Sequence, residues 1–522
     1  MASVAVLFSA CSKDPSPPQW DVDLLAPLFI TELTVSDLIA DSLLDVAPDG
    51  ALTLRFTDEL FGFKLDTAFE VPDTSIAYRF ALPIPGSLNF PAGSTFFSEE
   101  QTSDLGITDV QLRFLELREG LLHVDLTNMV QSNMIATFSL PSASLNGQPA
   151  VLTEQVGPGT PQNPAMAAVT RDLSGYWFDL RGPQFNTVNT LTSLVSTQLD
   201  PNGSGATVTS QDSVIAIANY DGLVPAYARG FFGQRTIEVG PDVSEVDVFD
   251  GIIAGALDLD QVQAELTIRN GIGVDARVHI AYLRSLNANT GTTVDLMHPV
   301  VGAPINLNRA IDLGNSPAPS TWSVTLDELN SNIDLFVENL PTALEYELDV
   351  LVNPLGDVSN GNDFLYYESE LIAELGVDIP LRLALDQFTL QSTVRVDLPG
   401  SEENHGLQYG TLYLFATNGF PFSADLTLEI VDQAGTVHGV LPSPVNVPAG
   451  TLGVDDLVSS PTTVRREIEV AAEELDLLYQ HDRLRITSVF NTAGSGHVSI
   501  LDGYQLDLQL TARANYIVNG DE

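Results

Sequence analysis

Hydrophobic and polar positions alternate over much of this chain, most regularly between residues 409 and 451. Residues 412–416 place Leu, Leu and Ala on one face, because successive side chains of a strand point to opposite faces. Asn418 interrupts the alternation, which resumes at residues 424–430. Asn and the following Gly both tolerate the backbone angles of a tight turn. The pattern predicts antiparallel strands, joined by turns, with one buried face.

The same strand–asparagine–strand pattern occurs three times, at Asn128, Asn270 and Asn418. Their spacings are 270 − 128 = 142 and 418 − 270 = 148 residues. The only tryptophans, Trp20, Trp177 and Trp322, recur at similar intervals along the sequence, with spacings of 157 and 145 residues. Two markers that recur in step predict three structural repeats of roughly 150 residues each.

We therefore predict a mainly β fold of tandem antiparallel β-sandwich-like domains, each with one short helix. Stretches rich in Gly, Pro and polar residues at 153–170 and 315–320 suggest the boundaries. The predicted domains are residues 20–170, 171–318 and 319–522, the last with a C-terminal extension.

Three segments have the spacing expected of the short helices. The first follows Ser36, which can cap a helix, and the second covers residues 188–195. In the third, Thr325 and Glu328 have the spacing of a capping box, and residues 329–340 carry an apolar stripe. We expect each helix to pack against a sheet.

Composition narrows the function. A length of 522 residues with 44% hydrophobic residues predicts several folded domains rather than a disordered chain. The formal net charge of −48 argues against nucleic acid as a partner, because phosphates would be repelled. No apolar run reaches the roughly 18 residues that a membrane helix needs. The acidic surface suggests either affinity for calcium or adaptation to salt. The alternative, which we favour, is a soluble extracytoplasmic protein from a salty habitat or a GC-rich genome.

The single cysteine, Cys11, follows a short apolar stretch that ends in Leu7, Ser9 and Ala10. These residues resemble the lipobox of bacterial lipoproteins, with Phe8 in a place where Leu is usual. The resemblance implies a signal peptide over residues 1–10 and a lipidated tether over residues 11–19. Residues 12–14, Ser-Lys-Asp, also resemble the short signal that sends Bacteroidota lipoproteins to the cell surface.

Sequence motifs of catalysis are missing: the chain has no Gly-x-Ser-x-Gly, no His-Glu-x-x-His and no phosphate-binding loop. We therefore expect no enzyme activity and no catalytic residues. The one candidate cofactor is calcium, for which the loop residues Asp357, Asn360, Asn362 and Asp363 supply oxygen atoms. The alternative for this loop, which we favour, is an Asx-rich turn between strands.

The segment from Asn418 to Thr451, with its Val-Pro-Ala-Gly motif, resembles the water-stress (WHy) domain of type-2 late embryogenesis abundant proteins. The resemblance spans about 40 residues. It implies a small β-sandwich of immunoglobulin-like shape, and it brings no catalytic residue with it.

Two functions remain open at this point. The first is a non-enzymatic lipoprotein of the outer membrane or cell surface, structural or adhesive, which binds other envelope proteins or glycans through its loops. The second is a lipid-binding or lipid-transfer module with an apolar groove between helix and curved sheet. A packed sandwich core favours the first function, and a continuous apolar tunnel favours the second.

Overall fold

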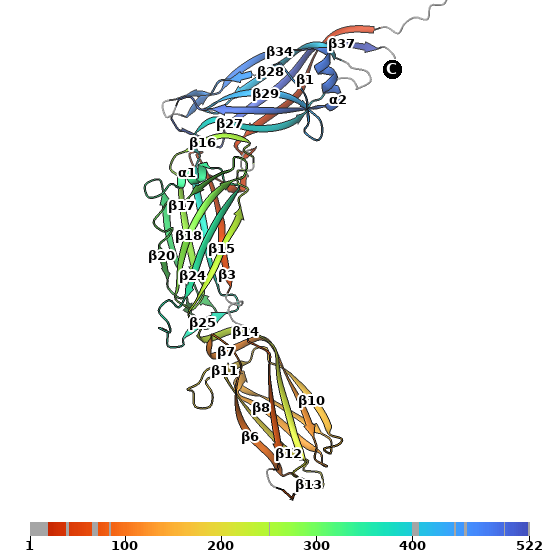
Figure 1. Cartoon of the computed structure of the whole chain (residues 1–522). Coiled ribbons are helices and arrows are strands. Elements are labelled where there is room, and N and C mark those ends of the chain that lie inside the picture. The colour runs from red at the N-terminus through yellow and green to blue at the C-terminus, as the bar shows by residue number, and fades with distance from the viewer. Residues whose placement is uncertain are drawn as a thin grey trace, which may run out of the picture.

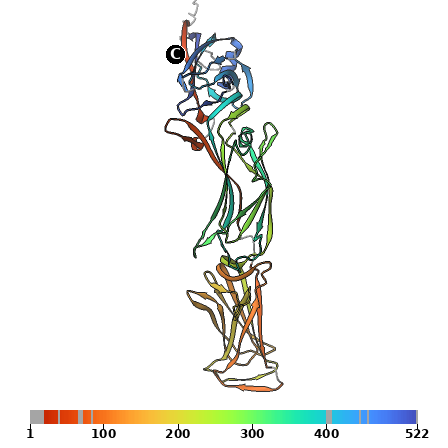
Figure 2. The same cartoon turned by 90° about the vertical axis from the view of Figure 1, so that its left-hand side faces the viewer.

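The computed structural model describes residues 19–37, 41–64, 71–82, 85–249, 251–398, 407–442, 445–453, 457–494 and 496–519. Strands make up 64% of the structure and helices 4%, which confirms the predicted mainly β, antiparallel architecture. Figure 1 and Figure 2 show three β-rich bodies arranged end to end in an elongated molecule. We call them the basal, middle and distal sandwiches.

The distal sandwich is formed by one continuous stretch of chain. Its strands are β4 (Thr74–Ala81), β5 (Ser87–Phe90), β6 (Thr95–Asp104), β7 (Gln111–Asn128), β8 (Met134–Leu145), β9 (Gln148–Val156), β10 (Ala165–Asp172), β11 (Trp177–Asp179), β12 (Thr190–Leu199), β13 (Ala206–Thr209) and β14 (Ser213–Phe231). Strand β11 pairs with both β7 and β8 and so joins the two sheets.

The middle sandwich takes strands from both sides of that stretch. Its elements are β2 (Leu44–Val46), β3 (Leu52–Lys64), β15 (Arg235–Glu245), β17 (Gln263–Asn270), β18 (Ala276–Asn287), β19 (Thr292–Asp295), β20 (Pro304–Leu307), β21 (Ile311–Asp312), β22 (Pro317–Ala318), β23 (Ser320–Asp327), α1 (Ile333–Glu338), β24 (Ala343–Val352) and β26 (Glu370–Pro380). Between β24 and β26, the short strand β25 (Asp363–Tyr366) leaves this body and pairs with β14 of the distal sandwich.

The basal sandwich combines the first and the last described strands. Its elements are β1 (Gln19–Thr34), β16 (Ala254–Leu259), β27 (Arg382–Arg395), β28 (Leu407–Asn418), β29 (Ser423–Val431), β30 (Val437–Val440), β31 (Val445–Val447), β32 (Thr451–Leu452), β33 (Val458–Ser460), β34 (Thr462–Val470), α2 (Ala472–His481), β35 (Arg483–Asn491), β36 (Val498–Ser499) and β37 (Gln505–Asn519). Strand β1 pairs with β37 along almost its whole length.

All three sandwiches have the same eight-strand order. Numbered along the chain within each body, strands 1-8-3-6 form one sheet and strands 2-7-4-5 form the other. In the first sheets these are β4-β14-β7-β10 (distal), β3-β26-β17-β23 (middle) and β1-β37-β28-β34 (basal). In the second sheets they are β6-β12-β8-β9, β15-β24-β18-β19/β20 and β27-β35-β29-β30/β31. This order is that of a jelly roll, an eight-stranded double sheet with two Greek keys.

The three jelly rolls are nested. The distal sandwich is inserted between strands 1 and 2 of the middle one, β3 and β15, and the middle sandwich lies between strands 1 and 2 of the basal one, β1 and β27. The chain therefore crosses from middle to distal after β3 and returns after β14. Between basal and middle it crosses four times: after β1, β15, β16 and β26.

The nesting corrects the predicted domain boundaries. Contiguous domains at 20–170, 171–318 and 319–522 would separate β1 from β37 and β3 from β26, which are paired neighbours in their sheets. The strand order also differs from the immunoglobulin-like order implied by the WHy resemblance, in which strands ABED face strands CFG.

The second and third predicted helices need correction, and the first lies partly outside the described residues. Residues 188–195 lie largely in β12, because pairing with β6 and β8 overrides the helical spacing. Helix α1 spans only Ile333–Glu338, so Leu329, which is 96% exposed, lies outside the apolar stripe. Around Ser36 the described residues form the 3-10 turns Val35–Asp37 and Asp41–Leu43, followed by strand β2, and residues 38–40 of this predicted helix lie outside the described residues. Helix α2 packs near β28, β29 and β30, and no α-helix occurs among the described residues of the distal sandwich.

Alternating inward side chains fill the space between the sheets. Strand β29 buries Ala424, Leu426, Leu428 and Ile430, each with 0% exposure. Burying one leucine or isoleucine side chain contributes about 1.5–3 kcal/mol. The sandwiches therefore have packed cores.

Candidate functional site

Asn418 is fully buried at the end of β28, where the chain passes from one sheet of the basal sandwich to the other. Its Oδ1 accepts the Phe420 N–H at 2.9 Å. Its Nδ2 donates to the carbonyl oxygens of Phe422, at 2.8 Å, and Pro448, at 3.0 Å. One side chain thus closes its own turn and ties that turn to the segment after β31.

Asn270 and Asn128 make the same three hydrogen bonds in the middle and distal sandwiches. Asn270 bonds the backbone of Ile272, Val274 and Asn308. Asn128 bonds the backbone of Val130, Ser132 and Gly157. In each case the partners lie two residues on, four residues on and across the turn. All three asparagines end the third strand of their jelly roll and are at most 1% exposed. They are equivalent positions of a repeated fold.

A backbone hydrogen bond completes each of these asparagine turns. The carbonyl of the residue two places after the asparagine accepts an N–H from Gly450 in the basal, Ala310 in the middle and Gly159 in the distal sandwich. Each donor lies two residues after the remote carbonyl that the asparagine bonds. The role of these asparagines is therefore structural, since every polar atom of the amide is used within the fold.

The predicted equivalence of the tryptophans does not hold. Trp20 lies on strand 1 of the basal sandwich, Trp322 on strand 6 of the middle one, and Trp177 on β11, which lies outside the eight-strand order. Trp177 is 38% exposed and stacks on Tyr227 at a ring distance of 5.6 Å. The similar spacing of the tryptophans along the chain is a coincidence.

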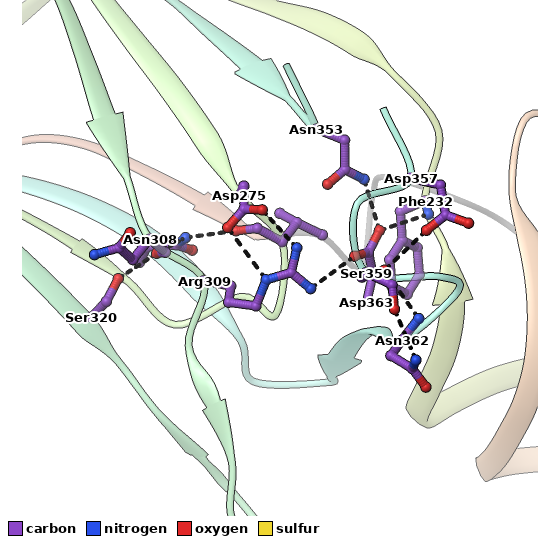
Figure 3. Close-up of polar contacts among 12 residues, drawn as sticks. Phe232, Asp275, Asn308, Arg309, Ser320, Asn353, Asp357, Ser359, Asn362 and Asp363 are labelled. Carbon is purple, nitrogen blue, oxygen red and sulfur yellow. Dashed lines mark hydrogen bonds and ion pairs between the residues drawn. The ribbon is translucent and has the colours of Figure 1, made fainter. Parts of the chain in front are cut away.

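The loop proposed for calcium lies at the junction between the middle and distal sandwiches (Figure 3). Asp357 Oδ1 accepts the Gly361 N–H at 2.7 Å and the Ser359 hydroxyl at 3.1 Å, the pattern of an Asx-type turn. Asn362 Nδ2 donates to the Ser359 carbonyl at 2.8 Å. These bonds give the loop its shape.

Two arginines of the distal sandwich bind this loop. Arg113 Nη1 donates to the Asn360 carbonyl at 2.6 Å, and Arg229 Nη2 donates to Asn362 Oδ1 at 2.7 Å. The loop oxygens thus bind guanidinium groups of the neighbouring sandwich.

Asp363, at the end of the loop, is 1% exposed and belongs to a separate ion-pair network. Its Oδ1 lies 3.2 Å from Arg309 Nη1, and its Oδ2 accepts Asn353 Nδ2 at 2.7 Å. Arg309 also pairs with Asp275 at 2.7 Å (Figure 3). Burial raises the pKa of Asp363, and this effect outweighs the hydrogen bonds and the Arg309 charge that favour the ionised form.

Asp357 and Asp363 share Ser359 as a partner, but their other partners differ: the Gly361 N–H for Asp357, and Asn353 and Arg309 for Asp363. Among the described residues, no group of three or more His, Cys, Asp and Glu side chains could hold a metal ion. We expect millimolar calcium to raise the melting temperature no more than sodium chloride of equal ionic strength. Both salts screen the net charge of −48, whose self-repulsion opposes folding. Melting curves of the protein and of Asp357→Asn test this, and a calcium-specific rise that the variant abolishes would contradict it.

A second contact locks the same junction. Asp312, in the β21–β22 hairpin of the middle sandwich, accepts the hydroxyls of Tyr366 at 2.6 Å and Tyr227 at 2.8 Å. Burial opposes ionisation of Asp312, but the hydrogen bonds from Tyr366, the Gly314 N–H and Tyr227 outweigh it and lower its pKa. Burial, followed by the hydrogen bond to Asp312, raises the pKa of Tyr227.

Sequence reasoning missed these junction residues, because their partners lie far away in the chain. Tyr227 and Asp312 are 85 residues apart, and Arg229 and Asn362 are 133 residues apart. Cys11 lies outside the described residues. No helix that the structure describes is long and apolar enough to cross a membrane.

The comparisons with known proteins add little. No protein-family model and no curated protein matches the chain. Among solved structures, the chain is similar to one titled a "putative secreted protein" from Parabacteroides distasonis ATCC 8503, with 10% sequence identity and a TM-score of 0.29. The alignment covers 95% of this chain and 100% of that one. So low a TM-score carries no argument about the fold, location or function of this chain.

Proposed function

We propose that this protein is a non-enzymatic lipoprotein of the bacterial outer membrane or cell surface, a spacer that presents its distal sandwich to a partner. The observation that carries the proposal is the nesting. The first and last described strands, β1 and β37, pair within the basal sandwich, and the distal sandwich lies at the other end of the molecule (Figure 1). A lipid on Cys11, eight residues before β1, would hold the basal sandwich at the membrane.

The junctions support a spacer. A bead-like chain has one covalent connection between neighbouring domains, and bending at such linkers is the default expectation. Here the chain crosses each junction at least twice, and β25 adds hydrogen-bonded pairing between the middle and distal sandwiches. The Arg113, Arg229 and Asp312 contacts restrict that junction further.

Jelly rolls occur in capsid and lectin domains, but a fold alone does not determine function. Envelope proteins and glycans both remain candidate partners. The packed cores weigh against a lipid-transfer module, which needs a continuous apolar tunnel.

Metabolic labelling with a fatty-acid analogue tests the anchor. Expressed in a bacterial host behind a complete signal sequence, the protein should incorporate the label, and Cys11→Ser should not, because the thiol is the only one in the chain. Protein amounts in the two strains serve as the control. Labelling that persists in the variant would refute the anchor.

A further inference from the structure

Two adjoining cavities lie where the basal sandwich meets the middle one. The first, of about 60 Å³, is lined only by apolar side chains, among them Leu54 and Ile379 from the middle sandwich. The second, of about 130 Å³, is lined by residues of β27 and β35, among them Leu390, Ile486 and Phe490. The two cavities share the lining residues Leu385, Phe388, Phe420 and Phe422.

The asparagine turn of the basal sandwich builds one wall of both cavities. Asn418 bonds the backbone of Phe420 and Phe422, whose rings stack at 4.9 Å. The equivalent residues are Ile272 and Val274 in the middle sandwich, and Val130 and Ser132 in the distal one. An aromatic wall at this position is thus specific to the basal sandwich.

One polar residue that lines the second cavity, Ser488, is buried. It is 1% exposed on strand β35, among the inward positions Leu484, Ile486 and Phe490. Its neighbours on the adjacent strands are Leu390 and Leu426. Among the residues that the structure describes, no hydrogen-bond partner reaches its Oγ. A buried hydroxyl without a partner destabilises a fold, so it needs an explanation.

The sister sandwiches indicate that the fold itself does not require this hydroxyl. Ser488 pairs with Leu426, which lies eight residues after Asn418. The matching pairs are Val350 with Val278 in the middle sandwich and Thr197 with Ala136 in the distal one. Val350 is 1% exposed, so an apolar side chain fits this place. The Thr197 hydroxyl also has no hydrogen-bond partner within the described ranges, but its methyl group contributes apolar packing that serine lacks.

We propose that these cavities bind a small amphipathic molecule: a compact apolar body, such as a phenyl ring or short alkyl chain, with one hydrogen-bonding head. The body would lie against Phe388, Phe420 and Phe422, and the head would bond the Ser488 hydroxyl. The size is suitable, because a cavity of about 150 Å³ lined by apolar side chains binds benzene. It is too small for the acyl chains of a whole lipid.

Titration with benzyl alcohol and with toluene, followed by ligand-observed NMR on the full chain, tests this proposal. Both probes should bind, and benzyl alcohol should bind more tightly. Ser488→Val, which installs the residue of the middle sandwich, should weaken benzyl alcohol about fivefold, the effect of losing one neutral hydrogen bond, and leave toluene unchanged. Ser488→Ala should do the same and guards against a packing defect in the valine variant.

Thr197→Val is the matched control, because it changes the equivalent position of the distal sandwich. It should leave the binding of both probes unchanged. The proposal would be overturned if benzyl alcohol or toluene failed to bind up to its solubility limit. It would also be overturned if benzyl alcohol bound the protein and both Ser488 variants with equal affinity. Loss of binding in Thr197→Val alone would overturn it as well, because the site would then lie in the distal sandwich.

Discussion

Replacing Asn418 with leucine is expected to destabilise the basal sandwich by about 3–9 kcal/mol. The change leaves the Phe420 N–H and the carbonyls of Phe422 and Pro448 buried without the partners they have now. Each such group costs about 1–3 kcal/mol. Because a whole domain is stable by only about 5–15 kcal/mol, the loss should be evident in denaturant unfolding.

The positions of the three tryptophans make this measurement specific. Trp20, Trp322 and Trp177 lie in the basal, middle and distal sandwiches, respectively. Variants that keep one tryptophan each, with phenylalanine in place of the others, therefore report on one sandwich at a time. Asn418→Leu should shift the Trp20 transition most and the Trp177 transition least.

Asn446→Leu is the matched control for Asn418→Leu. Asn446 lies in the same sandwich on strand β31, and its exposed side chain donates only to Asp425 at the surface. Its replacement should change stability by less than about 0.5 kcal/mol. Equal losses of unfolding free energy in the two variants would show that the buried hydrogen bonds of Asn418 stabilise the sandwich no more than a surface hydrogen bond does.

The distal sandwich, expressed alone as residues 71–234, is expected to fold. All eight strands of its jelly roll, β4 to β14, lie within this segment. The segment loses contacts at one junction: the short pairing of β25 with residues 227–230, and the hydrogen bonds of Arg113, Tyr227 and Arg229 to the middle sandwich. We expect dispersed amide resonances in a ¹H–¹⁵N correlation spectrum and a cooperative thermal transition.

The segment 171–318, which matches a predicted contiguous repeat, is the comparison. It contains β17 without its two neighbours β23 and β26, and β12 without β6 and β8. Its sheet edges would have unpaired backbone groups and its hydrophobic cores would be incomplete, so the 171–318 segment should be unfolded or aggregated. A folded 171–318 segment together with an unfolded 71–234 segment would contradict the nested architecture.

Sequence reasoning reached the strands and the repeat because both depend on local patterns. Alternation around Asn418 reflects one buried face of β28 and β29, and the recurring asparagine marks strand 3 of each jelly roll. Each insertion falls between strands 1 and 2, so strand 3 of every sandwich comes after the inserted segment. These third strands, β7, β17 and β28, therefore follow one another along the chain. The spacing of about 145 residues therefore survives in the sequence.

The same insertion hides the domain boundaries. Strand 1 of the basal sandwich, β1, precedes both inner sandwiches, and its partner β37 follows them. Nothing local in residues 19–34 identifies a partner nearly five hundred residues away. The helical spacing at 188–195 misleads for a related reason, since β6 and β8 supply the pairing that selects a strand. The arginines that bind the loop of Asn360 and Asn362 are also far from it in sequence, by 247 and 133 residues.

A cross-link between the first and last strands tests the nesting most directly. Ile30 and Gln509 are exposed, directly opposed neighbours on β1 and β37. Opposed residues of antiparallel strands have Cβ atoms roughly 4.5–5.5 Å apart, close to the separation that a disulfide needs. In a Cys11→Ser background, Ile30→Cys with Gln509→Cys should oxidise to an intramolecular disulfide and migrate faster on a non-reducing gel. Two thiols that remain free under the same oxidation would contradict the pairing of β1 with β37, and with it the nested arrangement of the three sandwiches.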